Sequence, residues 1–92
     1  MKLTTLISTI DEVDEEAIIF QSNLEDFTSD IILSYAEPND NGIKEENGIK
    51  YYYLLEVFLA KEFIDDWLNS LSYKPSLEET AKRLFEYAIN DA

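Results

Sequence analysis

The sequence has no cysteine and no histidine, and its 92 residues include only two glycines and two prolines. Without cysteine there are no disulfides, no thiolate nucleophiles and no zinc ribbons. Without histidine there is no imidazole general base, no Ser-His-Asp triad and little ligand chemistry for zinc or copper. These absences remove the commonest catalytic and metal-binding sites, so we expect a non-enzymatic protein with no bound metal and no cofactor.

Basic residues and long apolar runs are also scarce. Seven Lys and Arg against 20 Asp and Glu give a net charge of -13 and a pI near 4.1. Phosphate binding requires clustered positive charge, which argues against direct contact with nucleic acid. The longest apolar runs, residues 51–55 and 57–60, are far shorter than the roughly 20 residues of a membrane helix. The first residues lack the apolar stretch of a signal peptide, so we expect a cytoplasmic protein with no membrane contact.

What the chain does contain is enough apolar material to fold. Hydrophobic residues make up 46% of the sequence and aromatic residues 13%, which is too apolar for a disordered acidic tail. A chain of this length supports one modest hydrophobic core. We therefore expect a single compact domain over residues 1–92, with the acidic side chains on its surface.

The first residues have the spacing of a short amphipathic helix. The apolar positions that share one helical face are Leu3, Leu6, Ile7, Ile10 and Val13. Five acids follow within residues 11–16, and negative charge is unfavourable at the C-terminus of a helix. The helix is therefore predicted to end near Ile10 or Asp11.

Three segments have the composition of strands. Residues 17–21 and 30–36 are short, apolar and β-branched, and the continuous apolar centre of the second favours a position inside the sheet. Residues 50–56 predict a third strand, antiparallel to the second. Residues 37–48, between the last two strands, hold both Asn-Gly pairs and predict a loop.

That loop contains a short duplication. The tetrapeptide Asn-Gly-Ile-Lys occupies residues 41–44 and again residues 47–50. Two readings stay open: the repeat has no function, or it offers a hairpin two competing turn positions. The loop also has a faint likeness to a calcium-binding loop, but the closing position, which requires Glu, is Gly48.

The remainder of the chain predicts two helices. The buried stripe of the first is Val57, Ala60, Ile64, Trp67, Leu68 and Leu71. The second begins with Ser76 and Glu79 as a capping box, and its buried face is Leu77, Ala81, Leu84, Phe85 and Ala88. Two favourable ion pairs are expected along it, Glu78–Lys82 and Glu79–Arg83. Together the segments predict an α+β fold with a small three-stranded antiparallel sheet packed against three helices, in the order α-β-β-β-α-α.

Negative charge is unevenly distributed along the chain. Residues 1–43 hold ten acids and one base, a net charge of -9, whereas residues 44–92 hold ten acids and six bases, a net charge of -4. Unpaired acids of one sign speed association with a basic partner, although they also serve plain solubility. The candidate partner-binding residues are Asp11, Glu12, Asp14, Glu15, Glu16, Glu25, Asp26 and Asp40.

Aromatic residues concentrate in the middle of the chain, at residues 51–53 and at Phe58, Phe63 and Trp67. Core packing explains such a concentration. An alternative is that one or two of the tyrosines at residues 51–53 anchor a protein interface, where Tyr and Trp are enriched. The alternative function is therefore a structural or adaptor protein that forms a homodimer through an aromatic patch.

The C-terminal half resembles a known kind of protein. Residues 54–64, Leu-Leu-Glu-Val-Phe-Leu-Ala-Lys-Glu-Phe-Ile, and residues 87–92, Tyr-Ala-Ile-Asn-Asp-Ala, are similar to a family of small, acidic, uncharacterised bacterial proteins with the character of immunity proteins. Phage proteins that disable bacterial defence nucleases share this character. The resemblance implies a cytoplasmic inhibitor, monomeric or homodimeric, that blocks a basic nucleic-acid-processing partner. The expected partner is a toxin nuclease or a bacterial defence complex, and the expected mode of action of the carboxylates is nucleic-acid mimicry.

Overall fold

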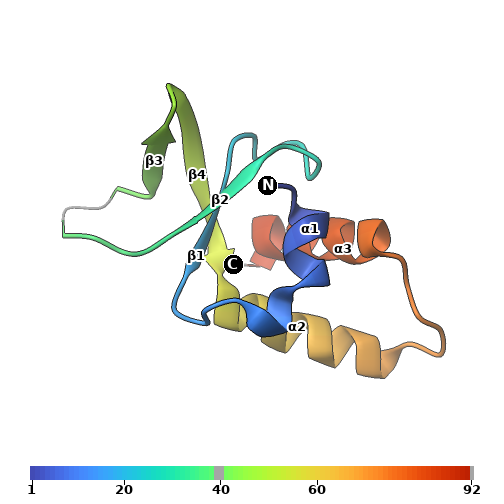
Figure 1. Ribbon diagram of the computed structural model, residues 1–92. Helices are drawn as coiled ribbons and strands as arrows, with labels where there is room; N and C mark the ends of the chain where they lie inside the picture. The colour runs from blue at the N-terminus through green and yellow to red at the C-terminus, as the bar shows by residue number, and fades with distance from the viewer. Residues whose placement is uncertain (39–40, 92) are drawn as a thin grey trace.

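The computed structural model describes residues 1–38 and 41–91, and in them the chain is an α+β protein with a four-stranded antiparallel sheet and three α-helices (Figure 1). In chain order the elements are α1 (Leu3–Ser8), the short 3-10 helix η1 (Ile10–Glu12), β1 (Ile18–Gln21), β2 (Ile31–Ser34), β3 (Ile43–Glu46), β4 (Ile49–Glu56), α2 (Val57–Ser70) and α3 (Leu77–Asp91). The α+β class and the three helices are confirmed. The three-stranded sheet is wrong by one strand.

The strand order in the sheet is β2-β1-β4-β3. The last predicted strand therefore pairs with the first, and it does not pair with the second as expected. The strand predicted inside the sheet, β2, lies at its edge. Its apolar run has another cause: Ile31 and Leu33 pack into the core, while Ile32 lies opposite Phe20 of β1.

The additional strand is β3, which falls inside the predicted loop. Its sequence, Ile-Lys-Glu-Glu, lacks the alternation of a half-buried strand, and three of its four residues are exposed. Asn47 and Gly48 form the two-residue turn into β4, with φ angles of 54° and 79°. This pair of positive φ angles suits a tight hairpin turn, so the second copy of the repeated tetrapeptide makes the turn.

The register of β1 against β4 contains a bulge. Ile19 lies opposite Leu55 and Phe20 lies opposite Tyr53, so Leu54 has no partner on β1. A bulge interrupts the alternation of side chains between the two faces of a strand. As a result, the consecutive residues Leu54 and Leu55 are both buried in the core.

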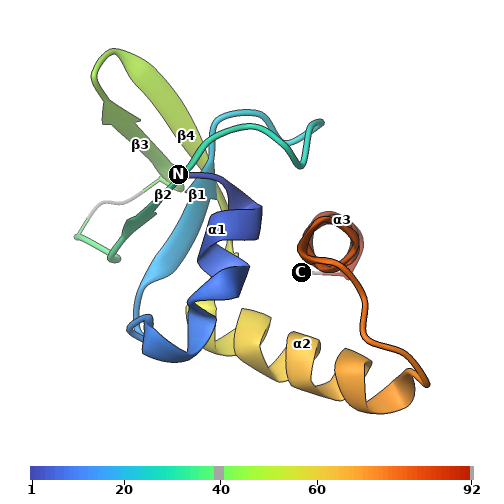
Figure 2. The same cartoon turned by 45° about the vertical axis from the view of Figure 1, so that its right-hand side comes forward.

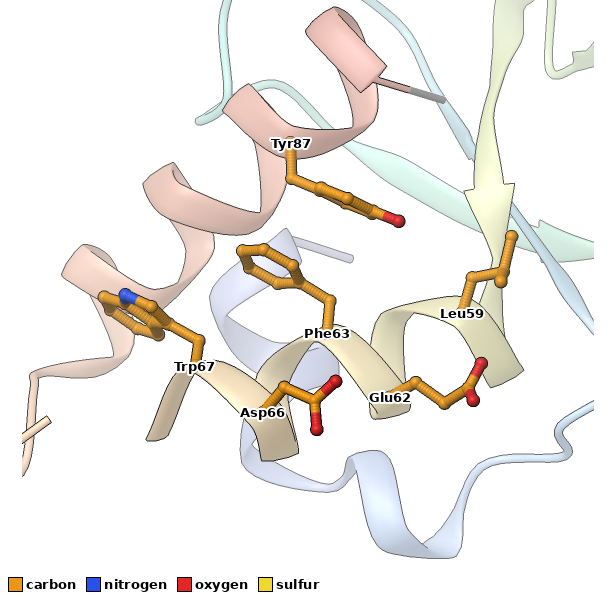
Figure 3. Close-up of a pocket in the computed structure, with 6 residues that line it drawn as sticks. All are labelled: Leu59, Glu62, Phe63, Asp66, Trp67 and Tyr87. Atoms are coloured by element: carbon orange, nitrogen blue, oxygen red, sulfur yellow. The ribbon is translucent and has the colours of Figure 1, made fainter. Parts of the chain in front are cut away.

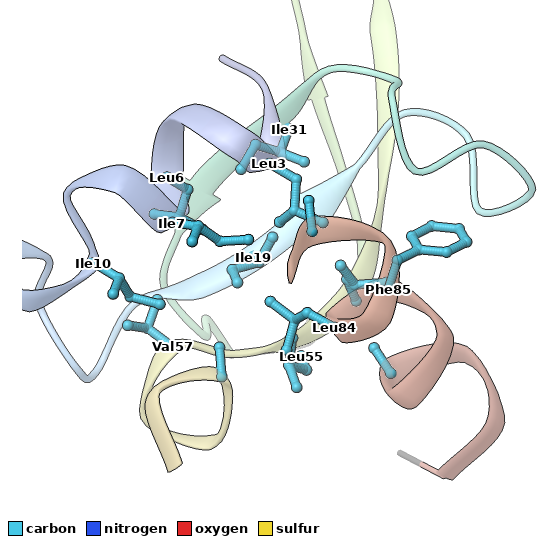
Figure 4. Close-up of a cluster of buried hydrophobic side chains, with 14 of the residues drawn as sticks. Leu3, Leu6, Ile7, Ile10, Ile19, Ile31, Leu55, Val57, Leu84 and Phe85 are labelled. Carbon is cyan, nitrogen blue, oxygen red and sulfur yellow. The ribbon is translucent and has the colours of Figure 1, made fainter. Parts of the chain in front are cut away.

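All three helices lie on one side of the sheet, and α3 packs beside α1 (Figure 2). The core fills the space between them (Figure 4). Its most completely buried members come from α1, β1, β2, the β4–α2 junction and α3, and include Leu3, Leu6, Ile19, Ile31, Leu55, Val57 and Leu84. The predicted apolar stripe of the first helix is confirmed, although α1 ends at Ser8 and Ile10 belongs to η1.

Some details of the last two helices differ from the prediction. Leu68 and Leu77 are exposed, and each lies at an end of its helix: Leu68 in the last turn of α2 and Leu77 at the first position of α3. The Ser76 hydroxyl accepts the Glu79 N–H at 3.0 Å, which confirms the N-cap. The Glu79 carboxylate accepts a hydrogen bond from the Tyr73 hydroxyl instead of pairing with the base four residues on.

The described helices form no ion pair between Glu78 and Lys82 or between Glu79 and Arg83. Exposed pairs of this kind contribute little, so their absence costs the helix a few tenths of a kcal/mol at most. Over the residues that the structure describes, no helix is both long and apolar enough to cross a bilayer.

Candidate protein-binding surface

The acidic residues 11–16 lie in η1 and in the turn that leads into β1, next to the first turns of α2 (Figure 1). Lys61 of α2 fixes this segment. Its ammonium group donates a hydrogen bond to the Val13 carbonyl at 3.0 Å and lies 3.7 Å from the Glu15 carboxylate. The side chain of Lys61 is only 18% exposed, so α2 and the acidic segment are joined by a largely covered contact.

This contact creates a concave acidic surface of about 590 Å³, which we call the acidic hollow. The residues that line it are Asp11, Glu15, Phe58, Lys61, Glu62 and Asp65. Two of these acids come from the segment before β1 and two from α2. The Phe58 ring lies among them with 46% of its surface exposed.

The charge of the acidic hollow is mostly uncompensated. Among the described residues Lys61 is the one base that lines it, and its ammonium is already engaged by Val13 and Glu15. Asp11, Glu62 and Asp65 make no side-chain hydrogen bond or ion pair with any residue in the described part of the chain. Four carboxylates around an exposed aromatic ring give a surface that attracts cationic groups.

Of the other predicted residues in this segment, Glu12 and Glu16 are exposed to solvent close to the acidic hollow. Asp14 is different because its carboxylate is used within the chain. One oxygen accepts the Glu16 N–H at 2.9 Å and the other accepts the Tyr35 hydroxyl at 3.0 Å. These hydrogen bonds, the backbone one first, hold the pKa of Asp14 below its ordinary value.

Glu25 and Asp26 lie at the other end of β1, in the loop that leads into β2, so the structure does not bring them to the acidic hollow (Figure 1). Asp26 accepts hydrogen bonds from the Thr28 hydroxyl at 2.6 Å and from the Thr28 N–H at 2.9 Å. Both bonds lower the pKa of Asp26. Its carboxylate therefore shapes a turn. Asp40 lies outside the described residues.

In the sequence Phe58 stands out only as one of the concentrated aromatic residues, and acids such as Glu62 and Asp65 are typical of an ordinary solvated helix face. None of the three is therefore among the predicted partner-binding residues. The position of Phe58 in the sequence does indicate that its ring is exposed. One position after Val57, it lies outside the buried stripe of α2. Acids four and seven positions later share that outer face, so the spacing indicates an exposed ring with negative charge beside it.

The predicted aromatic patch is divided: Phe58 lies in the acidic hollow, and the other rings lie in two further places. Tyr51 is buried, and Tyr53 contacts the Phe20 ring edge to face at 6.3 Å on the sheet. Burial, together with a 2.6 Å hydrogen bond to Glu56, raises the pKa of Tyr53 to about 12. Other aromatic side chains gather between α2 and α3, far along the chain from these tyrosines.

This second place is a groove of about 420 Å³, the aromatic groove (Figure 3). The residues that line it are Leu59, Glu62, Phe63, Asp66, Trp67 and Tyr87. Glu62 lies between the aromatic groove and the acidic hollow and contributes to both. The outer surface of α2 therefore carries two adjoining concave regions.

No group of three or more Asp and Glu side chains within residues 1–38 and 41–91 is arranged to hold a metal ion. Comparison of the chain with protein-family models, with curated proteins and with solved structures found no match. The two concave regions are therefore the features of the chain whose chemistry points to a function.

Proposed function

We propose that this protein is a non-enzymatic acidic inhibitor of the immunity-protein kind, which binds a basic nucleic-acid-processing protein and blocks the surface that meets phosphates. The observation that carries the proposal is the acidic hollow, in which uncompensated carboxylates surround the exposed Phe58. A surface that binds nucleic acid is rich in Lys and Arg, so carboxylates at phosphate-like positions complement it. The partner is a toxin nuclease or a bacterial defence complex.

The mechanism follows from the two kinds of side chain in the acidic hollow. The net charge of -13 speeds the encounter with a basic protein, and this effect weakens as salt screens the field. Phe58 then supplies an apolar anchor at the centre of the contact, where aromatic residues contribute most to interfaces. Glu12 and Glu16 extend the negative surface around this centre, while Asp14 and Asp26 act through the turns that they stabilise.

The experiment starts with the partner that co-purifies from the native host, and then measures association rates at low and high salt. In the test variant Asp11→Asn, Glu15→Gln and Asp65→Asn remove three charges from the acidic hollow and leave Glu62 unchanged. The matched control, with Glu45→Gln, Glu46→Gln and Glu86→Gln, removes the same charge from exposed residues elsewhere. We expect the association rate at low salt to fall by about tenfold or more in the test variant only.

Equal rates for the test variant and the matched control would refute the acidic hollow as the binding surface. Phe58→Ala adds a second measurement, because loss of a central aromatic anchor raises the dissociation rate by about tenfold or more. A competition assay then decides the mode of inhibition: the partner's nucleic acid must be displaced by the wild-type protein. Simultaneous binding of both would rule out nucleic-acid mimicry.

The homodimer is a second proposal of a different class. The division of the aromatic residues between the sheet and the aromatic groove removes the single patch on which it was based. Sedimentation distinguishes the two functions, since a dimer that forms with rising concentration and resists high salt favours a structural or adaptor role.

A further inference from the structure

The aromatic groove has one rigid wall. The rings of Phe63 and Tyr87 stack at a centroid distance of 4.4 Å and an interplanar angle of 20°, which joins α2 to α3 (Figure 3). Both side chains also pack against the hydrophobic core. Since the core supports them, these rings are held in place before any ligand arrives.

The Trp67 ring is in a different situation. It is partly exposed, and it is not among the side chains that pack against the core. Within the described residues its indole makes no ring contact and donates no hydrogen bond. Trp67 therefore presents an aromatic face to the groove, and packing against the core does not explain the position of this ring.

The two acids of the groove are in an electrostatically unfavourable arrangement. Glu62 and Asp66 are four residues apart on α2, a spacing at which like charges destabilise a helix. Neither carboxylate has a basic partner among the residues that the structure describes. In Figure 3 the Asp66 carboxylate lies on the α2 side of the groove near the Phe63 and Trp67 side chains, and the Glu62 carboxylate extends along α2 toward Leu59.

A bound cation accounts both for the exposed Trp67 ring and for the unpaired carboxylates of Glu62 and Asp66. Ring faces attract positive charge, most strongly at tryptophan, and two neighbouring carboxylates add Coulomb attraction. Among natural cations a guanidinium group fits best, because its plane stacks on an aromatic face while its N–H groups bond carboxylates at its edge. We propose that the aromatic groove is a binding site for an arginine side chain of the basic partner. This proposal rests on the proposed function only for the source of the arginine.

The chain offers its own reporter for a test, because Trp67 is the single tryptophan. The probe is the peptide acetyl-Gly-Arg-Gly-amide, titrated at low ionic strength while Trp67 emission is recorded. The isosteric peptide with citrulline in place of arginine has the same shape without the charge, and a lysine peptide has the charge without the plane. We expect saturable binding of the arginine peptide in the millimolar range, about threefold weaker binding of the lysine peptide and none of the citrulline peptide.

Two variants assign the response to the groove. Asp66→Asn should weaken arginine binding by about threefold at low salt, the effect of one exposed carboxylate. Glu86→Gln, the matched control, removes one charge from the exposed side of α3 and should leave the affinity unchanged. Trp67→Leu should abolish the shift that arginine causes in the Tyr87 ring resonances. Circular dichroism confirms that each variant is folded.

Equal binding of the arginine and citrulline peptides would overturn the proposal, as would the absence of any response to arginine. Tighter binding of the lysine peptide would overturn the stacking of a guanidinium. Failure here is separable from failure of the proposed function. If partner binding depends on Asp11, Glu15 and Asp65 but the arginine peptide leaves Trp67 emission unchanged, only the arginine site in the groove is refuted. If Trp67 responds to arginine but partner binding does not depend on those three acids, only the acidic hollow is refuted.

Discussion

Two acidic segments flank β1, and they use their carboxylates in opposite ways. In the loop of residues 22–30 the backbone closes on itself, since the Ser22 N–H donates to the Asp30 carbonyl at 2.9 Å and Lys2 pairs with the Asp30 carboxylate at 3.0 Å. In residues 11–16 the side chains of Asp11, Glu12 and Glu16 have no partner in the described structure. In residues 22–30 two of the three acids, Asp26 and Asp30, bond within the fold, whereas three of the five acids in residues 11–16 are left to solvent.

The difference follows from side-chain length more than from charge. Asp14 and Asp26 each accept the N–H two residues further along, from Glu16 and Thr28. The short aspartate side chain reaches this donor readily, whereas glutamate does not favour the same turn. Aspartates inside turns are therefore poor candidates for a binding surface.

The largest expected effect tests what holds the loop of residues 22–30 in place. The fully buried Gln21 side chain donates through Nε2 to the carbonyls of Phe27 and Ser29, each at 3.2 Å. Gln21→Ala removes these bonds and leaves a cavity, so the free energy of unfolding should fall by about 2 kcal/mol. Urea unfolding measures the loss, and hydrogen exchange should accelerate in residues 22–30 and not in residues 11–16.

Ser22→Ala is the control for this change. Ser22 follows Gln21 in the chain, and its hydroxyl makes no hydrogen bond with the described residues, so its loss should change the free energy of unfolding by less than about 0.5 kcal/mol. An unchanged urea midpoint for Gln21→Ala would show that the loop does not depend on the buried amide.

A smaller effect separates the charge of Asp26 from its role as a hydrogen-bond acceptor. Because the pKa of Asp26 is lowered in the folded state, its ionised form stabilises the protein above the unfolded pKa near 3.8, and this stability is lost as the pH falls through the folded pKa. Asp26→Asn keeps an acceptor for the Thr28 N–H but does not titrate. We expect its unfolding midpoint to change less than that of the wild type as the pH is lowered from above the unfolded pKa of Asp26 to below its folded pKa.

The comparison of wild type and variant at each pH cancels the relief of charge repulsion that acid brings to all other carboxylates. Glu25→Gln, next in the chain and free of side-chain partners in the described structure, is the control and should follow the wild type. Parallel curves for all three proteins would contradict a role for the ionised Asp26 in stability.

The parts of this molecule that were predictable depend on local sequence. The stripe of α1 and the N-cap at Ser76 follow from helical spacing and from a hydroxyl three residues before an N–H donor. β3 was missed because Ile43 is its single apolar residue. Its place in the sheet comes from pairing with β4, which the alternation within one strand does not reveal.

The acidic hollow was half predictable for a related reason. Asp11 and Glu15 stood out in a run of acids, whereas Glu62 and Asp65 were hidden in an ordinary helix surface. Lys61 joins the two sets by bonding Val13, 48 residues earlier in the chain. The packing of the whole core decides that α2 contacts residues 11–16. The distribution of charge along the sequence carries no information about this tertiary contact.

The smallest expected effect concerns the one tertiary bond of Asp14. The Tyr35 hydroxyl, on a side chain that is half exposed, donates to Asp14 at 3.0 Å, and this bond is the second largest cause of the lowered pKa, after the Glu16 N–H. In Tyr35→Phe the pKa of Asp14 should therefore rise, yet stay below its ordinary value, as measured from the carboxyl carbon resonance in an NMR titration. The pKa of Asp26, which Tyr35 does not contact, should stay the same. If the pKa of Asp14 returned fully to its ordinary value, the turn at residues 14–16 would depend on Tyr35. Residues 11–16 would then be tied to the sheet as firmly as residues 22–30.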